Sequence, residues 1–257
     1  MKLLTILLGL LVAFSVTAAP DREREQRMAN EIVDAILDGE PVTLQAGAHE
    51  FLAIHTLAEE PKGTVLILHG RGFHPDWPSV IQPLRVGLVE QGWSTLAIQM
   101  PVLDKAAKYY DYVEVFPDAI PRIEAALDYL EAADPDAKVV MLAHSCGYHM
   151  GQHWAHAHPQ AAQTRVDAYV GLGMGATDYQ QDMVEPFVLD NIQVPILDVY
   201  GDADYPAVRR AAPERWKMIL EAGNPKSAQK AIPEANHYYE GRNDALLAVI
   251  AQWLNGL

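Results

Sequence analysis

The sequence predicts an α/β protein in which a mainly parallel central sheet is covered by helices on both faces. Short apolar runs rich in β-branched residues alternate with longer amphipathic segments along most of the 257 residues. This alternation is typical of βαβ units. Half of the residues are hydrophobic, which is enough to build a sizeable core.

The elements follow from the period of the apolar residues and from the Gly and Pro residues that separate them. Strands are predicted over residues 49–57, 64–68, 93–100, 138–143, 166–172, 194–200 and 227–232. Helices are predicted over residues 21–38, 81–91, 117–133, 148–158, 207–222 and 244–254. Ligands of such sheets bind beyond the carboxyl ends of the strands, so residues that follow strands are the candidates for chemistry.

The N-terminus has the pattern of an export signal. Lys2 precedes an apolar run over residues 3–14 that is too short to span a bilayer comfortably, and small residues lead up to Ala18. The sequence therefore predicts a signal peptide over residues 1–18, a single domain over residues 19–257, and a periplasmic or secreted protein. An uncleaved membrane anchor is the alternative.

The composition limits the kinds of partner that the protein can bind. The formal net charge is −15, which argues against nucleic acid and against anionic lipid surfaces, because both bind basic proteins. Cys146 is the single cysteine, so an intrachain disulfide is excluded. The expected partner is a small molecule, without stable membrane insertion after signal cleavage, and the composition does not specify an oligomeric state.

The serine at position 145 has the surroundings of a nucleophile elbow. It lies between the strand predicted over residues 138–143 and the helix predicted over residues 148–158, with Ala143 two residues before it and Gly147 two residues after it. The turn requires nearly side-chain-free residues at both flanking positions. Ala143 therefore departs from a full match by one extra methyl group, because the motif has glycine at this position.

A serine hydroxyl is a weak nucleophile, so it needs a base, and the base needs an acid that orients it. His237 follows the strand predicted over residues 227–232, and Asp204 follows Gly201 at the end of the preceding strand. The chain order is thus Ser145, Asp204, His237, each at a predicted strand end. This agreement is much more specific than the elbow alone.

From His69 to the C-terminus the chain resembles the α/β-hydrolase superfamily. The Trp-Pro loop after His69-Gly70 and the segment at residues 200–204 resemble a poorly characterised bacterial branch, classed as a domain of unknown function. The resemblance implies the α/β-hydrolase fold. No cofactor is expected, and no metal, because no cysteine joins the histidines and no H-E-x-x-H pattern is present. Residues 173–194 offer room for a short helix over residues 178–190 but not for a cap domain, so the lid is expected to be short or absent.

Turns of this superfamily with the form Gly-x-x-Asp place the acid three residues after the glycine, which is Asp204. Asp202 is the near alternative, and its other interpretation is a residue that caps the turn. Asp198 is a further candidate, but it lies within the predicted strand and can also be interpreted as a structural acid at the edge of the core.

The oxyanion hole is expected to consist of two backbone N–H groups. One belongs to Cys146, directly after the nucleophile, and the other to Arg71 in the loop after His69-Gly70. His69 is interpreted as a structural residue that bonds the loop backbone, and the thiol of Cys146 as a buried group without a catalytic role.

The predicted function is a carboxylesterase-like serine hydrolase that cleaves an ester or related acyl bond. Two alternatives keep the same fold: an acyltransferase with the same triad, and a catalytically silent binding protein. A zinc-dependent enzyme is a further alternative, because His149, His153 and His156 have the spacing of one helical face.

Overall fold

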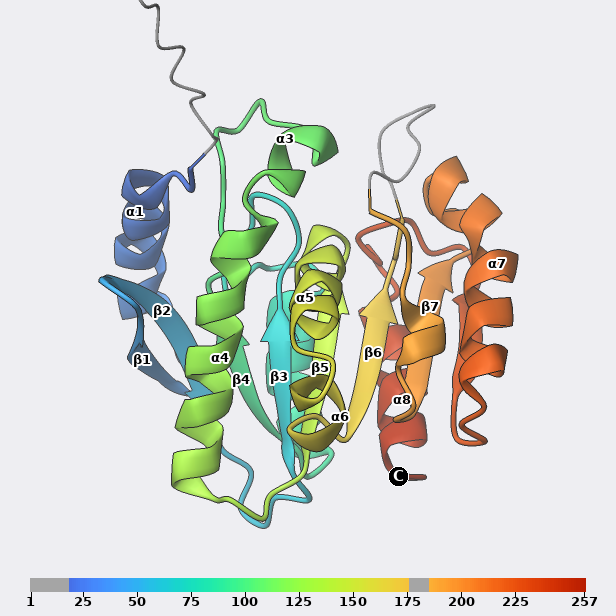
Figure 1. The fold of residues 1–257 in the computed structure, drawn as a ribbon. Helices are drawn as coiled ribbons and strands as arrows, with labels where there is room; N and C mark the ends of the chain where they lie inside the picture. The colour runs from blue at the N-terminus through green and yellow to red at the C-terminus, as the bar shows by residue number, and fades with distance from the viewer. Residues whose placement is uncertain (1–18, 176–184) are drawn as a thin grey trace, which may run out of the picture.

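In the computed structural model, which describes residues 19–175 and 185–257, eight strands form one sheet in the order β1-β2-β4-β3-β5-β6-β7-β8 (Figure 1). The strands are β1 Glu40–Ala46, β2 His49–Thr56, β3 Thr64–Leu68, β4 Ser94–Ile98, β5 Val139–His144, β6 Ala168–Leu172, β7 Ile196–Gly201 and β8 Ala228–Ile232. The pairs β1–β2 and β2–β4 are antiparallel, and every other neighbouring pair is parallel. The predicted architecture is therefore confirmed.

Helices cover both faces of this sheet. They are α1 Arg22–Ile32, α2 Ile81–Glu90, α3 Tyr109–Val113, α4 Phe116–Ala133, α5 Cys146–Ala157, α6 Ala161–Thr164, α7 Pro206–Ala222 and α8 Asn243–Leu254. Helices α4 and α5 lie in front of the sheet in Figure 1, whereas α8 lies behind it. Helix α1 lies beside the β1–β2 hairpin.

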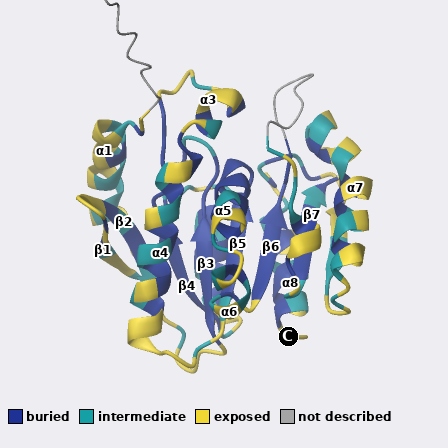
Figure 2. Cartoon of the chain, in the orientation of Figure 1, coloured by how far each residue is buried: buried dark blue, intermediate teal, exposed yellow. Residues whose placement is uncertain are grey.

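The central strands supply both halves of the core. In β3, Leu66 and Leu68 belong to the apolar cluster that includes α4 and α5, whereas Val65 and Ile67 belong to the cluster that includes α2 and α8. Figure 2 shows the central strands buried and the outer sides of the helices exposed. This two-sided burial explains why the strand appears in the sequence as a continuous apolar run.

Three short elements, β1, α3 and α6, were not predicted from the sequence. The first predicted helix is shorter than expected: α1 ends at Ile32, one 3-10 turn follows over Val33–Ala35, and the chain then forms β1. Pro41 argues against a strand, but a proline is tolerated here because β1 is an edge strand. The short helix α3 was also not predicted, because its five residues give too little periodicity for detection.

The connection between β6 and β7 runs over residues 173–195 and is too short for a cap domain. Most of the helix predicted over residues 178–190 lies outside the described residues. The described part of this connection contains the single turn η2, Leu189–Asn191. Among the residues that the structure describes, no helix is both long enough and apolar enough to cross a membrane.

Candidate active site

Three polar side chains converge at the carboxyl edge of the sheet. Ser145 lies in the turn between β5 and α5, Asp204 in the loop after β7, and His237 in the loop after β8. These strands belong to the parallel part of the sheet, so their carboxyl ends face the same side. The fold thereby joins residues that are 92 and 33 positions apart in the chain.

Hydrogen bonds link the three side chains in one line. His237 Nε2 lies 2.8 Å from Ser145 Oγ, and His237 Nδ1 lies 2.8 Å from Asp204 Oδ1. The carboxylate only accepts, so Nδ1 carries the proton and Nε2 is left to accept the serine proton. All three residues are buried, at 7% exposed or less, which protects these bonds from competing water.

The other two aspartates considered for this role lie elsewhere. Asp202 is exposed and accepts a hydrogen bond from the backbone N–H of Glu234 at 2.7 Å, which makes it a turn residue. Asp198 is fully buried in an ion pair with Arg215 at 2.8 Å. The geometry thus brings Asp204, and neither alternative, to His237.

The backbone at Ser145 has the conformation of a sharp strand-to-helix turn. Its φ is +53°, a value that costs about 1–3 kcal/mol for a residue with a side chain. The surrounding structure holds it, because the Ser145 N–H donates to Leu172 O at 2.8 Å and the Tyr148 N–H to Ser145 O at 3.0 Å. The strain presents Oγ at the edge of the sheet, as a nucleophile elbow requires.

The two flanking positions of the elbow are not equally crowded. A Cβ at Gly147 would lie 2.4 Å from His69 O, so this position admits only glycine. Ala143 is paired instead with Leu68 on one side and with Gly171 on the other. The methyl group of Ala143 is buried within β5, at 2% exposed.

The loop after β3 is fixed by His69. Its Nε2 accepts from the backbone N–H of Met100 at 2.9 Å, so Nδ1 carries the proton and donates to Gly70 O at 2.8 Å. Burial lowers the pKa of His69 to about 3, which keeps this neutral tautomer. In the trans peptide that follows Gly70, the N–H of Arg71 points away from that carbonyl.

Gly70 also lies directly against the nucleophile, because a Cβ there would be 3.4 Å from Ser145 Cβ. Cys146 begins α5, so its N–H has no acceptor within the helix and lies at the positive end of the helix dipole. Burial raises the pKa of the Cys146 thiol to about 12, so the thiol stays protonated near neutral pH.

His144 has a role that the sequence prediction missed. Its Nε2 donates to the backbone carbonyl of His237 at 2.9 Å, across 93 positions of the chain. Its ring also lies 5.0 Å from the His237 ring and 5.9 Å from the Phe73 ring. His144 therefore holds the loop that carries the base, and no local sequence pattern signals a contact between residues so far apart.

The histidines on α5 do not form one polar face. His149 is buried, with Gly175 O 3.4 Å from its Nε2, while His153 pairs with Glu185 at 3.0 Å and His156 is exposed. Within residues 19–175 and 185–257, no group of three or more His, Cys, Asp or Glu side chains is arranged to hold a metal ion. The geometry thus gives no support to the zinc alternative.

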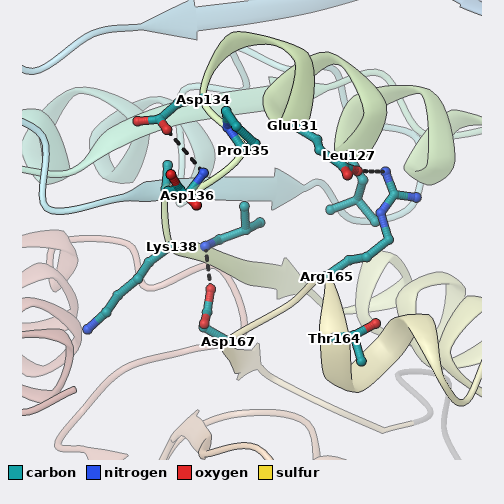
Figure 3. Close-up of a pocket in the computed structure, with 11 residues that line it drawn as sticks. Leu127, Glu131, Asp134, Pro135, Asp136, Lys138, Thr164, Arg165 and Asp167 are labelled. Carbon is teal, nitrogen blue, oxygen red and sulfur yellow. Dashed lines mark hydrogen bonds and ion pairs between the residues drawn. The ribbon is translucent and has the colours of Figure 1, made fainter.

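A polar cavity of about 330 Å³ lies far from this site, near the amino ends of β5 and β6 (Figure 3). Two of its charged side chains pair with neighbouring groups: Arg165 with Glu131 at 3.1 Å, and Asp167 Oδ2 with the Val139 N–H at 2.8 Å. These contacts stabilise the turns at the amino ends of β5 and β6.

We expect the protein to lose stability in mild acid because three histidines are buried in the uncharged form. Burial lowers the pKa from 6.5 to about 3 for His69 and His144 and to about 4 for His149. Below pH 6.5 the unfolded chain binds protons that the folded chain does not. The free energy of unfolding should therefore fall with a slope that approaches about 4 kcal/mol per pH unit near pH 5, since each of the three groups contributes up to about 1.4 kcal/mol per unit.

The raised pKa values of Glu25 and Asp198, caused by burial, act in the opposite direction and reduce the net slope. Urea unfolding between pH 7.5 and 5 measures this slope. The variant His149→Phe should remove about a third of the histidine contribution, and equal stability across this range would contradict the prediction.

Comparison with known proteins agrees with the fold. Residues 12–113 match a family described as "Protein of unknown function (DUF3530)", a segment that ends before Ser145. No curated protein matches the chain. Among solved structures, dienelactone hydrolase from Anabaena variabilis is 18% identical with a TM-score of 0.65, and the match covers 85% of this chain and 97% of that one.

Two further structures are similar. Est1E from Butyrivibrio proteoclasticus is 16% identical with a TM-score of 0.63, covering 85% of this chain and 98% of that one. A serine hydrolase without a lid from Xanthomonas campestris is 15% identical with a TM-score of 0.59, covering 86% and 95%. The chain therefore has the α/β-hydrolase fold, and its N-terminal part resembles an uncharacterised family.

Proposed function

We propose that the protein is a serine hydrolase that cleaves a carboxylic ester or a related acyl bond. The observation that carries this proposal is the unbroken line of hydrogen bonds from Ser145 through His237 to Asp204, with both distances at 2.8 Å. The strained backbone at Ser145 supports it further, because that conformation presents Oγ for attack.

In the proposed reaction, Ser145 Oγ attacks the carbonyl carbon while His237 Nε2 takes its proton. The tetrahedral intermediate places its negative oxygen against the backbone N–H groups of Cys146 and Arg71. His237 then protonates the leaving alkoxide, and the acyl group stays on Ser145 until water attacks by the same route in reverse. Asp204 stabilises the positive charge that His237 carries in both halves.

The oxyanion assignment is supported by the two loops that supply it. The Gly70 carbonyl is held by His69, which turns the Arg71 N–H to the opposite side of the peptide. The Cys146 N–H lies at the start of α5. Each such donor contributes about 3–4 kcal/mol to lowering the barrier in enzymes of this kind.

Short p-nitrophenyl esters provide the test of this function. We expect hydrolysis with an initial burst of p-nitrophenol that is stoichiometric with the enzyme, because the acyl group is transferred to Ser145 before water releases it. Added alcohol distinguishes acyl transfer, since a transferase yields the transesterified product in preference to the free acid. A folded protein that turns over no ester would support the catalytically silent alternative.

We also propose that the protein is exported, that residues 1–18 are removed as a signal peptide, and that residues 19–257 form one domain. The charge pattern around the apolar run over residues 3–14 supports this. N-terminal sequencing of the protein from the periplasm or medium should begin at Ala19. An intact Met1 in a membrane fraction would instead indicate an anchor.

A further inference from the structure

Helix α1 is attached to the rest of the protein mainly through polar contacts. Glu25 is the one residue of this fully described helix that is buried, at 8% exposed. Just before the helix, the Asp21 N–H donates to Val102 O at 2.7 Å. Amphipathic helices normally attach through an apolar face, so a buried acid in this place calls for a specific explanation.

Glu25 is bound at the carboxyl end of β4. Its carboxylate accepts from the Val102 N–H at 3.0 Å and forms an ion pair with Arg122 of α4 at 2.9 Å. Arg122 in turn donates to Gln99 O at 3.0 Å. Because both charges are buried, the position of each depends strongly on the other.

The same contacts continue into the oxyanion loop. The side-chain amide of Gln99 donates to Met100 O at 2.8 Å, and its Nε2 lies 2.9 Å from His69 Nε2, where it shares the one lone pair of that nitrogen with the Met100 N–H. His69 then donates from Nδ1 to Gly70 O at 2.8 Å. A series of polar contacts through Arg122, Gln99 and His69 therefore links Glu25 to the peptide whose N–H belongs to Arg71.

Arg24 provides a second, shorter link. Its guanidinium donates to Leu103 O and, at 3.3 Å, to Gly72 O. Gly72 has a φ of +73°, and a Cβ there would lie 3.5 Å from the Arg24 guanidinium. Arg24 thus contacts the end of the loop at residues 70–72 directly, whereas Glu25 is linked to the start of that loop only through intervening residues.

We propose that α1 belongs to the catalytic apparatus, with Glu25 and Arg24 as positioning residues that fix the oxyanion loop through the loop after β4. This inference rests on the proposed function, because it concerns the same oxyanion hole. Neither residue contacts the substrate in this account. Their effect is to hold the Arg71 N–H where the negative oxygen forms.

The first test replaces Glu25 by Gln, which keeps the size of the side chain but removes its charge. We expect kcat to fall about tenfold to a hundredfold with little change in KM, because only the transition state uses the oxyanion hole. Arg24→Ala should act in the same direction. Glu23→Gln and Arg27→Ala are matched controls, since that pair lies exposed on the same helix and should leave kcat unchanged.

A double variant separates positioning from folding. Glu25→Leu with Arg122→Met removes both buried charges, so the stability lost in the single variant should return. The double variant lacks the hydrogen bond from Arg122 to Gln99, and its kcat should therefore be low even though it is stable. Recovery of kcat together with stability would overturn the proposal, because the helix would then have only a structural role.

Two further readouts complete the test. Binding of an alkyl trifluoromethyl ketone, which forms a tetrahedral adduct on serine, should weaken by the same factor as kcat/KM in active-site-titrated protein. Hydrogen exchange at residues 69–73 should rise in Glu25→Gln but not in Glu23→Gln. This exchange is measurable even if the wild-type protein hydrolyses no ester. Failure of the proposed function and failure of this inference are therefore distinguishable. Unchanged exchange in Glu25→Gln would overturn the inference.

Discussion

Replacing Asp204 by Asn should lower kcat by about 10⁴-fold while leaving the fold intact. The carboxylate now accepts the Nδ1–H of His237 at 2.8 Å and stabilises the charge that the ring acquires. A neutral amide cannot stabilise that charge. If its NH2 group faces Nδ1, it also imposes the tautomer in which Nε2 carries a proton and cannot act as a base.

Asp202→Asn is the matched control for this prediction. Asp202 lies two residues away, follows the same strand, and bonds the Glu234 N–H instead of His237. It should keep nearly wild-type kcat. The measurement is steady-state ester hydrolysis by both variants after thermal unfolding has established that they are folded. A larger loss in Asp202→Asn would show that the acid is assigned to the wrong residue.

Gly173→Ala should lower kcat/KM by about 100-fold or more, the size of effect that a displacement near 1 Å has on a catalytic group. Gly173 directly follows β6, and a Cβ there would lie 2.9 Å from His237 Cε1 and 3.2 Å from Asp204 Oδ2. The methyl group would therefore displace the base from its acid. The His237–Asp204 pair is compatible with glycine alone at this position.

The control for this change is Gly47→Ala in the turn between β1 and β2. Gly47 has the same φ, +59°, but none of the described atoms lies within 4 Å of the position that a Cβ would take there. Both substitutions should cost about 1–2 kcal/mol of unfolding free energy from the left-handed backbone. Only Gly173→Ala should lose activity, so equal activity of the two variants would contradict the triad geometry.

The sequence predicted those elements whose pattern is local. The strand over residues 64–68 matches β3 in full, because it is buried on both faces and therefore continuously apolar. The strand β1 was missed although Val42, Leu44 and Ala46 alternate with polar residues, because Pro41 is unusual in a strand and was interpreted as part of the helix end. Its pairing with β2 depends on its place at the sheet edge, which local sequence does not reveal.

In the candidate site, too, local patterns predicted some residues, whereas contacts between distant residues could not be predicted. Chain order and strand ends were sufficient to nominate Ser145, Asp204 and His237, because each follows a recognisable strand. The groups that hold them were not predictable in this way. The contacts of His144 with His237 and of Glu25 with Arg122 join residues 93 and 97 positions apart, so they exist only once the sheet has formed.

Labelling by a fluorophosphonate probe is the most direct test of whether Ser145 is an activated nucleophile. We expect one probe per folded molecule, mapped by mass spectrometry to Ser145, with no labelling of Ser145→Ala and strongly slowed labelling of His237→Ala. Absence of labelling in folded wild-type protein, or a probe attached to another residue, would contradict this expectation.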